Sequence, residues 1–203
     1  MQYKIHSHRH GETVLKEEKY AHLYKELLEA IDNISDQDLI DRHESYDGKS
    51  MSMSKAINEL MKERLVEKGW TAEAPIFNES EYLDGSKWYL DFAKESISVE
   101  VAFNHGEATS WNLLKPVLAS ELNDVNKAIQ TEVGVVITAT QELKTTGAFD
   151  GAVGTYEKFL TYLKPMQNQL TVPMVVIGLK APRSFVLEKK KIDGKNVGVV
   201  HKV

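Results

Sequence analysis

Two acidic residues, Asp91 and Glu100, lie in neighbouring runs of aromatic and β-branched residues. The runs span residues 88–92 and 97–103, and the polar segment 93–96 joins them. This pattern predicts a β-hairpin that brings the two carboxylates close together. Carboxylates held side by side repel each other, and hard oxygen ligands of this kind suit Mg²⁺, which keeps several waters. The pair therefore predicts a metal-dependent hydrolase site.

A second interpretation is that the two side chains are solvated surface residues. The chain has 30 acidic residues in 203, so an Asp and a Glu beside a hairpin are common by composition alone. A short spacing of this kind carries a high false-positive rate. Spacing alone does not separate the two interpretations.

Further segments precede and follow the acidic pair in a definite order. Upstream, the segment 57–65 runs into Lys68-Gly69-Trp70. The series continues with Asp91-Phe92, Val99-Glu100-Val101, Phe103, Asn104-His105, Gly134-Val135-Val136-Ile137, Gln141-Glu142-Leu143-Lys144, Thr155-Tyr156-Glu157 and 173–179. The ordered series resembles the BglII, BstYI and BamHI group of type II restriction endonucleases, in the PD-(D/E)XK nuclease superfamily. The resemblance covers about residues 55 to 180.

The resemblance implies roles for individual residues. Asp91 and Glu100 match the two metal-binding carboxylates, and the backbone carbonyl of Val101 is the implied third oxygen ligand. Glu73, counted from Trp70, is the implied further catalytic residue facing the site, and Mg²⁺ is the implied cofactor. The implied DNA-reading residues are Asn104, His105, Thr145, Thr146, Asp150 and Gly151, the last four in an expected loop before a helix.

Ala102 departs from the pattern of the group, which places Gln or Glu at this position, or Lys in the wider nuclease superfamily, to help orient the attacking water. Several explanations are open. Glu73, Asn104 or His105 compensates, or the reaction depends on the metal alone, or this enzyme is weakened. The last alternative is that Ala102 is a plain apolar strand residue in a protein that is not an enzyme.

The implied function is Mg-dependent, sequence-specific hydrolysis of phosphodiester bonds in double-stranded DNA at a short palindrome, which the resemblance suggests is centred on GATC. A two-fold symmetric site predicts a homodimer with one active site per strand. One alternative is a catalytically weakened DNA-binding protein with a nuclease fold, because fold does not fix function. Another is a metal-dependent nuclease for single-stranded or structured DNA.

Composition agrees with a compact enzyme. A length of 203 residues with 42% apolar content predicts one α/β unit, residues 1–203 forming a single endonuclease domain. The net charge of −5 argues against non-specific coating of nucleic acid, although a cleft can be locally basic. Without cysteines, disulfides and thiol chemistry are excluded. We expect no membrane insertion and no leader, and a cytoplasmic location.

The hydrophobic periodicity predicts a mixed central sheet flanked by helices, as in restriction endonucleases. We expect helices over 12–31 and from Ser54 to a stop at Gly69. Between them we expect a polar loop over 33–52 with one short helical turn at most. Further helices are expected from Ser110 or Asn112 to about 125, with Pro116 in the first turn, and over 151–163. Buried strands are expected over 133–138 and 172–179, and a terminal hairpin over 185–201 with its turn at Asp193-Gly194.

Two basic clusters have more than one interpretation. His6, His8 and His10 alternate, which suits either a transition-metal site or, as we favour, a solvated edge strand. The lysines of the terminal hairpin either contact phosphates or protect a sheet edge from aggregation, and the second interpretation is the more common one. These lysines are Lys189, Lys190, Lys191, Lys195 and Lys202.

Overall fold

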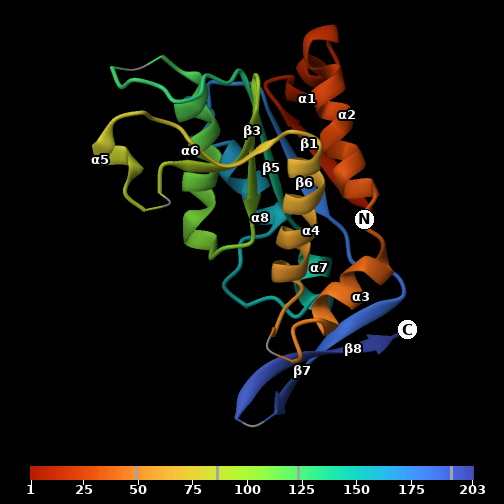
Figure 1. Cartoon of the computed structure of the whole chain (residues 1–203). Helices are drawn as coiled ribbons and strands as arrows, with labels where there is room; N and C mark the ends of the chain where they lie inside the picture. Colours follow the sequence, from red (N-terminus) through yellow and green to blue (C-terminus); the bar gives the residue numbers. More distant parts are fainter. Residues whose placement is uncertain (49, 86, 123, 193) are drawn as a thin grey trace.

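A six-stranded sheet forms the centre of the computed structural model, which describes residues 1–48, 50–85, 87–122, 124–192 and 194–203. The strand order is β1-β6-β5-β4-β3-β2 (Figure 1). The strands are β1 Tyr3–His8, β2 Thr71–Pro75, β3 Tyr89–Lys94, β4 Ile97–Ala102, β5 Val133–Ala139 and β6 Met174–Leu179.

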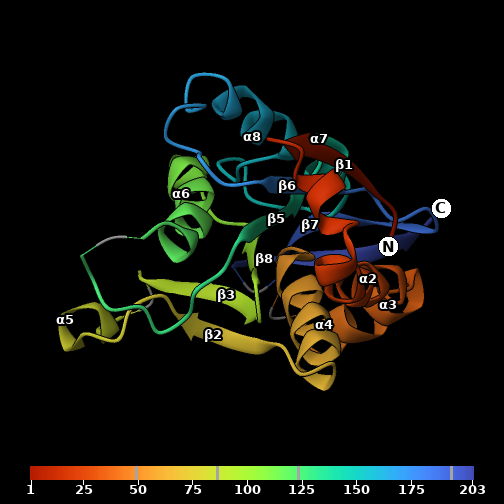
Figure 2. The ribbon, with the colours of Figure 1, turned by 90° about the horizontal axis from the view of Figure 1, so that it is seen from above.

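The sheet is mixed, as the sequence predicts. β4, β5 and β6 are parallel, whereas β1, β2 and β3 pair antiparallel with their neighbours. Every residue of β5 and β6 is buried, which agrees with their continuous apolar sequences. Helices cover both faces of these two strands, with α6 on one side and α2 and α4 on the other (Figures 1 and 2).

The first face is covered by α1 Gly11–Leu15, α2 Glu18–Asp32 and α4 Ser54–Glu67. The expected single helix over 12–31 is wrong, because the chain is extended at Glu17 and divides into two helices. The division lets α1 lie against β1 and β6 while α2 packs on α4. The predicted stop of α4 is confirmed, since Gly69 has a φ of 83° and Trp70 behind it is buried.

The segment 33–52 contains more helix than the single short turn that the sequence predicts, because α3, Asp36–Glu44, is nine residues long. Ser35 and Asp38 form a reciprocal capping box that satisfies two amides at the start of this helix. Leu39 and Ile40 are buried. The capping pair and these two apolar residues were the sequence signals for a helix. The many charged residues around them obscured its short hydrophobic periodicity.

The second face is covered by α6 Thr109–Ser120 and α8 Tyr156–Leu163. Pro116 lies well inside α6, not in its first turn as expected, because the short 3₁₀ turn Gly106–Ala108 leads directly into a helix that starts at Thr109. The predicted helix over 151–163 starts only at Tyr156, and α7, Gln141–Thr146, precedes it. The small helix α5 spans Ser80–Leu83.

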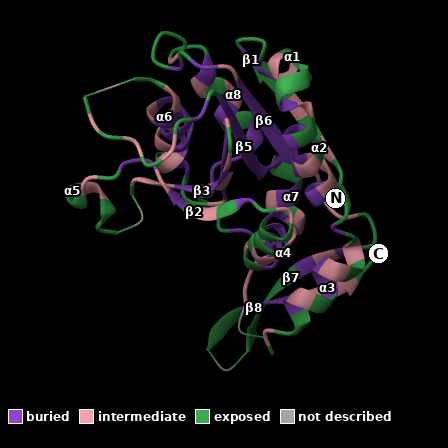
Figure 3. Cartoon of the chain, turned by 45° about the horizontal axis from the view of Figure 1, so that its top comes forward, coloured by how far each residue is buried: buried purple, intermediate pink, exposed green. Residues whose placement is uncertain are grey.

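The terminal hairpin is confirmed as the ribbon β7 Phe185–Ile192 and β8 Lys195–Lys202, which pair antiparallel along their length. Of its predicted turn, Asp193 lies outside the described residues and Gly194 has a positive φ of 79°. The ribbon projects from the body below α3 and α7, and its end away from the body is exposed (Figures 1 and 3).

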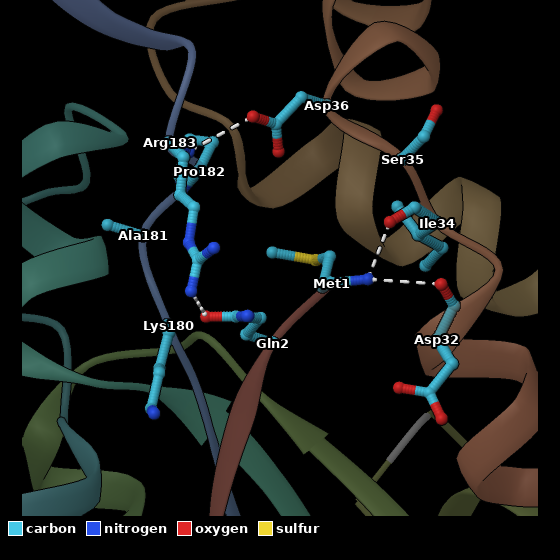
Figure 4. Close-up of a pocket in the computed structure, with 10 residues that line it drawn as sticks. All are labelled: Met1, Gln2, Asp32, Ile34, Ser35, Asp36, Lys180, Ala181, Pro182 and Arg183. Carbon is cyan, nitrogen blue, oxygen red and sulfur yellow. Dashed lines mark hydrogen bonds between the residues drawn. The ribbon is translucent and has the colours of Figure 1, made fainter.

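A pocket lies between α2, α3 and the segment before β7, and the residues that line it hydrogen-bond neighbouring parts of the chain (Figure 4). The amino group of Met1 donates hydrogen bonds to the carbonyls of Ile31 and Ile34. Asp36 accepts from the backbone amides of Arg183 and Ser184. These bonds join the N-terminus and the ribbon to the helices.

None of the helices in the described part of the chain has the length and apolar character that a bilayer crossing requires.

The close approach of α6 to the sheet depends on Gly134 of β5. A Cβ atom added there would lie 2.5 Å from Cβ of Pro116. We expect Gly134→Ala to lower the free energy of unfolding by about 1–3 kcal/mol, because α6 must shift outward. Denaturant unfolding measures the change. Gly151→Ala is the matched control, since nothing lies within 4 Å of its added Cβ; an equal loss in both variants would contradict the argument.

Candidate active site

The predicted hairpin of β3 and β4 holds the acidic pair at the point where the two strands stop pairing. The register ends at Phe92 opposite Val99, and the next residues along it are Asp91 and Glu100. In place of a ladder bond, the amide of Val101 donates to Oδ2 of Asp91 over 2.6 Å. Opposed residues of antiparallel strands point to the same face, so the fold places the two carboxylates together.

Glu73 belongs to the same row of the sheet. In the register of β2 with β3, Ala72 faces Phe92 and Ala74 faces Leu90, so Glu73 falls opposite Asp91. Glu73 has a φ of 52°, in the left-handed region, and it makes no ladder pair. Its side chain is 76% exposed and forms an ion pair with Lys62 over 2.9 Å. Three acidic residues thus occupy one row across three adjacent strands.

Glu100 is buried, with a relative exposure of 1%. Nζ of Lys115, from α6, lies 2.7 Å from its Oε2. Its other oxygen, Oε1, has no hydrogen-bond partner among the described residues. Burial, and then the neighbouring Asp91 carboxylate, raise the pKa of Glu100 to about 8, against the opposing effect of Lys115.

Asp91 lies deeper in the molecule than Glu73 but reaches a pocket of about 180 Å³. Burial raises the pKa of Asp91, while the Val101 amide and the Lys115 ammonium act in the opposite direction. Asn58 and Lys62 of α4 close the far side of this pocket. The residues that line it are Asn58, Lys62, Ala72, Glu73, Asp91, Phe92 and Val101.

The donor set fits a hard divalent cation. Asp91, Glu100 and the carbonyl of Val101 offer oxygen atoms of the kind that would serve as its ligands, and the buried Oε1 of Glu100 has no hydrogen-bond partner among the described residues. Among the described residues, the structure assembles no group of three or more His, Cys, Asp or Glu side chains as a ready metal cage. This arrangement suits Mg²⁺, which takes one or two carboxylates and keeps several waters.

Of the expected DNA-reading residues, Asn104 and His105 are exposed directly after β4. A second pocket, of about 490 Å³, is lined by His105 together with Lys144, Gly151 and Lys158 among others. Backbone hydrogen bonds join its two sides, since the Gly106 amide donates to the Ala152 carbonyl over 2.7 Å. The structure therefore brings His105 and Gly151 to one concave surface.

The expectation that Thr145 and Thr146 lie in a loop is wrong, because both belong to α7. Their hydroxyls donate to the carbonyls of Gln141 and Glu142 within that helix. Asp150 lies in the following loop, where Oδ1 accepts from the Ala152 amide over 2.7 Å. This side-chain turn shapes the loop between α7 and α8.

Comparison with known proteins decides the family. The family model described as restriction endonuclease BglII/BglIII matches residues 3–179. The chain belongs to this family. By that membership it is a type II site-specific deoxyribonuclease.

Solved structures agree with the BglII/BglIII family in fold. A crystal structure of the restriction endonuclease BglII complexed with a DNA 16-mer is 21% identical, with a TM-score of 0.68. The match covers 100% of this chain and 91% of that chain. Free BglII is 18% identical with a TM-score of 0.55, covering 100% and 93%. None of the curated protein sequences compared matches this chain.

Lys115 is the residue near Asp91 and Glu100 that sequence reasoning missed. It is the one charged residue in the segment 109–120, among apolar and small polar residues. Sequence alone does not show that its side chain turns to the sheet and not to solvent. A lone charge in an otherwise apolar helix was the available signal, because a buried Lys needs a buried partner.

The two basic clusters are also placed by the structure. β1 is an edge strand, and the interpretation that we favoured holds for His6, which is exposed on it. His10 is exposed but lies beyond the strand, just before α1, and His8 is buried, where its Nε2 hydrogen-bonds the Leu170 carbonyl over 2.9 Å. In the terminal ribbon, Lys189 donates to the Phe149 carbonyl over 2.8 Å. Lys190 pairs with Glu188 of its own strand. The ribbon thus contacts the loop between α7 and α8.

That loop is held by Lys144, whose Nζ donates to the carbonyls of Gly151 and Val153 over 2.7 and 2.9 Å. We expect Lys144→Met to speed amide hydrogen exchange at Ala152 and Val153 about tenfold, because hydrogen bonds to a charged donor each contribute about 1.5–3 kcal/mol. Hydrogen exchange with mass spectrometry measures this. Lys16→Met, on the exposed end of α1, is the control; unchanged exchange in the Lys144 variant would show that the loop is held by other contacts.

Proposed function

We propose that this protein is a Mg-dependent restriction endonuclease that hydrolyses both strands of double-stranded DNA at a short palindrome centred on GATC. The observation that carries the proposal is the acidic pair Asp91 and Glu100 at the end of the β3-β4 ladder, together with the buried Oε1 of Glu100, which has no hydrogen-bond partner among the described residues. The BglII–DNA complex of similar fold supports duplex DNA as the substrate.

The proposed chemistry is attack of a water in line with the leaving 3′ oxygen. Mg²⁺, when bound, supplies polarisation of the phosphate and a lowered pKa of the water. Asp91 and Glu100 would hold the cation together with the Val101 carbonyl. Glu73, exposed on the rim of the same pocket and paired with Lys62, is the further catalytic residue of this proposal. No covalent intermediate is required.

Sequence selection is proposed for the second pocket and its surroundings. Asn104, His105, Asp150 and Gly151 offer donors and acceptors that suit base edges, with His105 and Gly151 on one concave surface. The hydroxyls of Thr145 and Thr146, on α7, donate their protons to carbonyls of the same helix, but their oxygens can still accept hydrogen bonds from DNA. Lys144 and Lys158 add positive charge at this surface, which suits phosphates.

The biological role we propose is restriction in a restriction-modification system, carried out by residues 1–203 as a single endonuclease domain. A DNA methyltransferase encoded beside this gene would support that role. The cytoplasmic location stays a prediction.

A catalytically weakened DNA-binding protein is the second candidate, and Ala102 is the observation that favours it. Ala102 is buried against Leu113 and Val117 of α6 and carries no polar group that could orient a water. This candidate predicts DNA binding without cleavage. Digestion of a sequenced plasmid with Mg²⁺ separates the two functions: discrete bands support restriction, and diffuse fragments indicate a nuclease of another specificity.

We expect Asp91→Asn and Glu100→Gln each to lower cleavage by at least roughly 10³-fold, about 4 kcal/mol of transition-state stabilisation. Each change keeps the shape of the side chain but removes a charge that binds the metal. Binding of uncleaved duplex without metal should survive or tighten, because a carboxylate that repels the phosphate is lost. Single-turnover cleavage and a gel-shift titration measure the two effects.

The control for this pair is Glu18→Gln, an exposed carboxylate at the start of α2, which should cleave like the wild type. Full cleavage by Asp91→Asn would show that other carboxylates hold the metal.

The two-fold symmetry of a palindrome also calls for a homodimer, so we expect a dimer at micromolar concentration in sedimentation velocity. The proposed interface includes α6 and the segment after it, where Leu122 is 89% exposed, and α8. Leu122→Asp should weaken the dimer. A wild-type monomer, both alone and with duplex DNA, would argue against double-strand cleavage by paired sites.

A further inference from the structure

Lys115 and Glu100 form an ion pair that is almost completely removed from water. The two side chains are 10% and 2% exposed, and their charged atoms are 2.7 Å apart. Burying two charges costs free energy that their attraction does not always recover, so such a pair is weak support for stability alone. The position of this pair, beside Asp91, calls for another explanation.

The backbone around Lys115 is arranged so that its side chain reaches Glu100. Pro116 packs over Gly134, where the absence of a side chain allows α6 to approach the sheet. On β4, Ala102 lies two residues beyond Glu100 and therefore on the same face. Its small side chain packs with Leu113 and Val117 on either side of Lys115 in the sequence of α6.

We propose that Lys115 is a positioning residue of the metal site, supplied by α6 in place of the polar residue that β4 lacks at position 102. It holds Oε2 of Glu100, so that Oε1, which has no partner among the described residues, would be the oxygen left for a cation. This inference rests on the proposed function, because it gives Lys115 a part in the same hydrolysis.

Three roles of Lys115 make different predictions for Lys115→Met, which removes the charge and keeps a similar length. If Lys115 positions Glu100, both carboxylate oxygens become free, so metal binds more tightly but in the wrong geometry. If Lys115 only stabilises the fold, metal affinity and cleavage fall together. If Lys115 only neutralises Glu100 before metal binds, metal affinity rises and cleavage is unchanged.

The experiment measures Mn²⁺ affinity without DNA by calorimetry, and single-turnover cleavage at saturating Mg²⁺. We expect Lys115→Met to bind Mn²⁺ at least threefold more tightly and to cleave at least 100-fold more slowly. The double variant Lys115→Met with Ala102→Lys returns a cation to this face and should recover at least tenfold in rate. Cleavage within threefold of wild type, or affinity and rate that fall together, would overturn the proposal.

Lys94→Met is the matched control, because Lys94 forms a partly buried pair with Glu26 at 2.8 Å elsewhere on the sheet. It should leave Mn²⁺ affinity and cleavage within threefold of wild type. If Lys115→Met does not fold, the comparison uses Lys115→Arg and the double variant instead, because both keep a cation at the site. A folded Lys115→Arg that does not cleave and binds Mn²⁺ more weakly than wild type overturns the proposal.

The outcomes also separate this inference from the proposed function. Loss of cleavage in Asp91→Asn with normal cleavage in Lys115→Met rejects only the role of Lys115. A wild-type protein that cleaves no duplex with Mg²⁺ rejects the proposed function and the role of Lys115 with it.

Discussion

The arrangement of the site depends on the electrostatic repulsion between the carboxylates of Asp91 and Glu100. The two carboxylates fall at neighbouring positions where β3 and β4 stop pairing, and both are drawn away from water. The structure opposes the repulsion in two ways. The Val101 amide donates to Asp91, and the Lys115 ammonium contacts Glu100. One oxygen remains without a partner among the described residues, so the site retains capacity for a cation.

This local balance depends on packing at some distance from the carboxylates. α6 delivers Lys115 only because Pro116 and Gly134 allow helix and strand to approach closely. The same helix buries Ala102 through Leu113 and Val117. A change of volume between α6 and β5 therefore acts on the electrostatics of Glu100 without touching either charged side chain.

The sheet and the acidic hairpin could be predicted from sequence because strand periods and continuous apolar runs are strong local signals. Residues 97–102 and 133–139 illustrate this, and the family resemblance ordered them into a mixed sheet. The helix boundaries were less accessible. Glu17 breaks a helix because α1 and α2 pack on different elements, which is a tertiary effect. Lys115 was missed for the same reason, since its partner is 15 residues away and only packing brings them together.

The terminal ribbon lies beyond residue 179, where the match to the family model ends, yet Lys189 bonds to the Phe149 carbonyl in the loop between α7 and α8. The carboxylates, by contrast, belong to strands inside the matched region. Changes in the length or charge of the ribbon therefore act on this loop while the acidic row of the sheet stays fixed. Such a division gives the chain two separately adjustable parts, the acidic row of the sheet and the loop that the ribbon contacts.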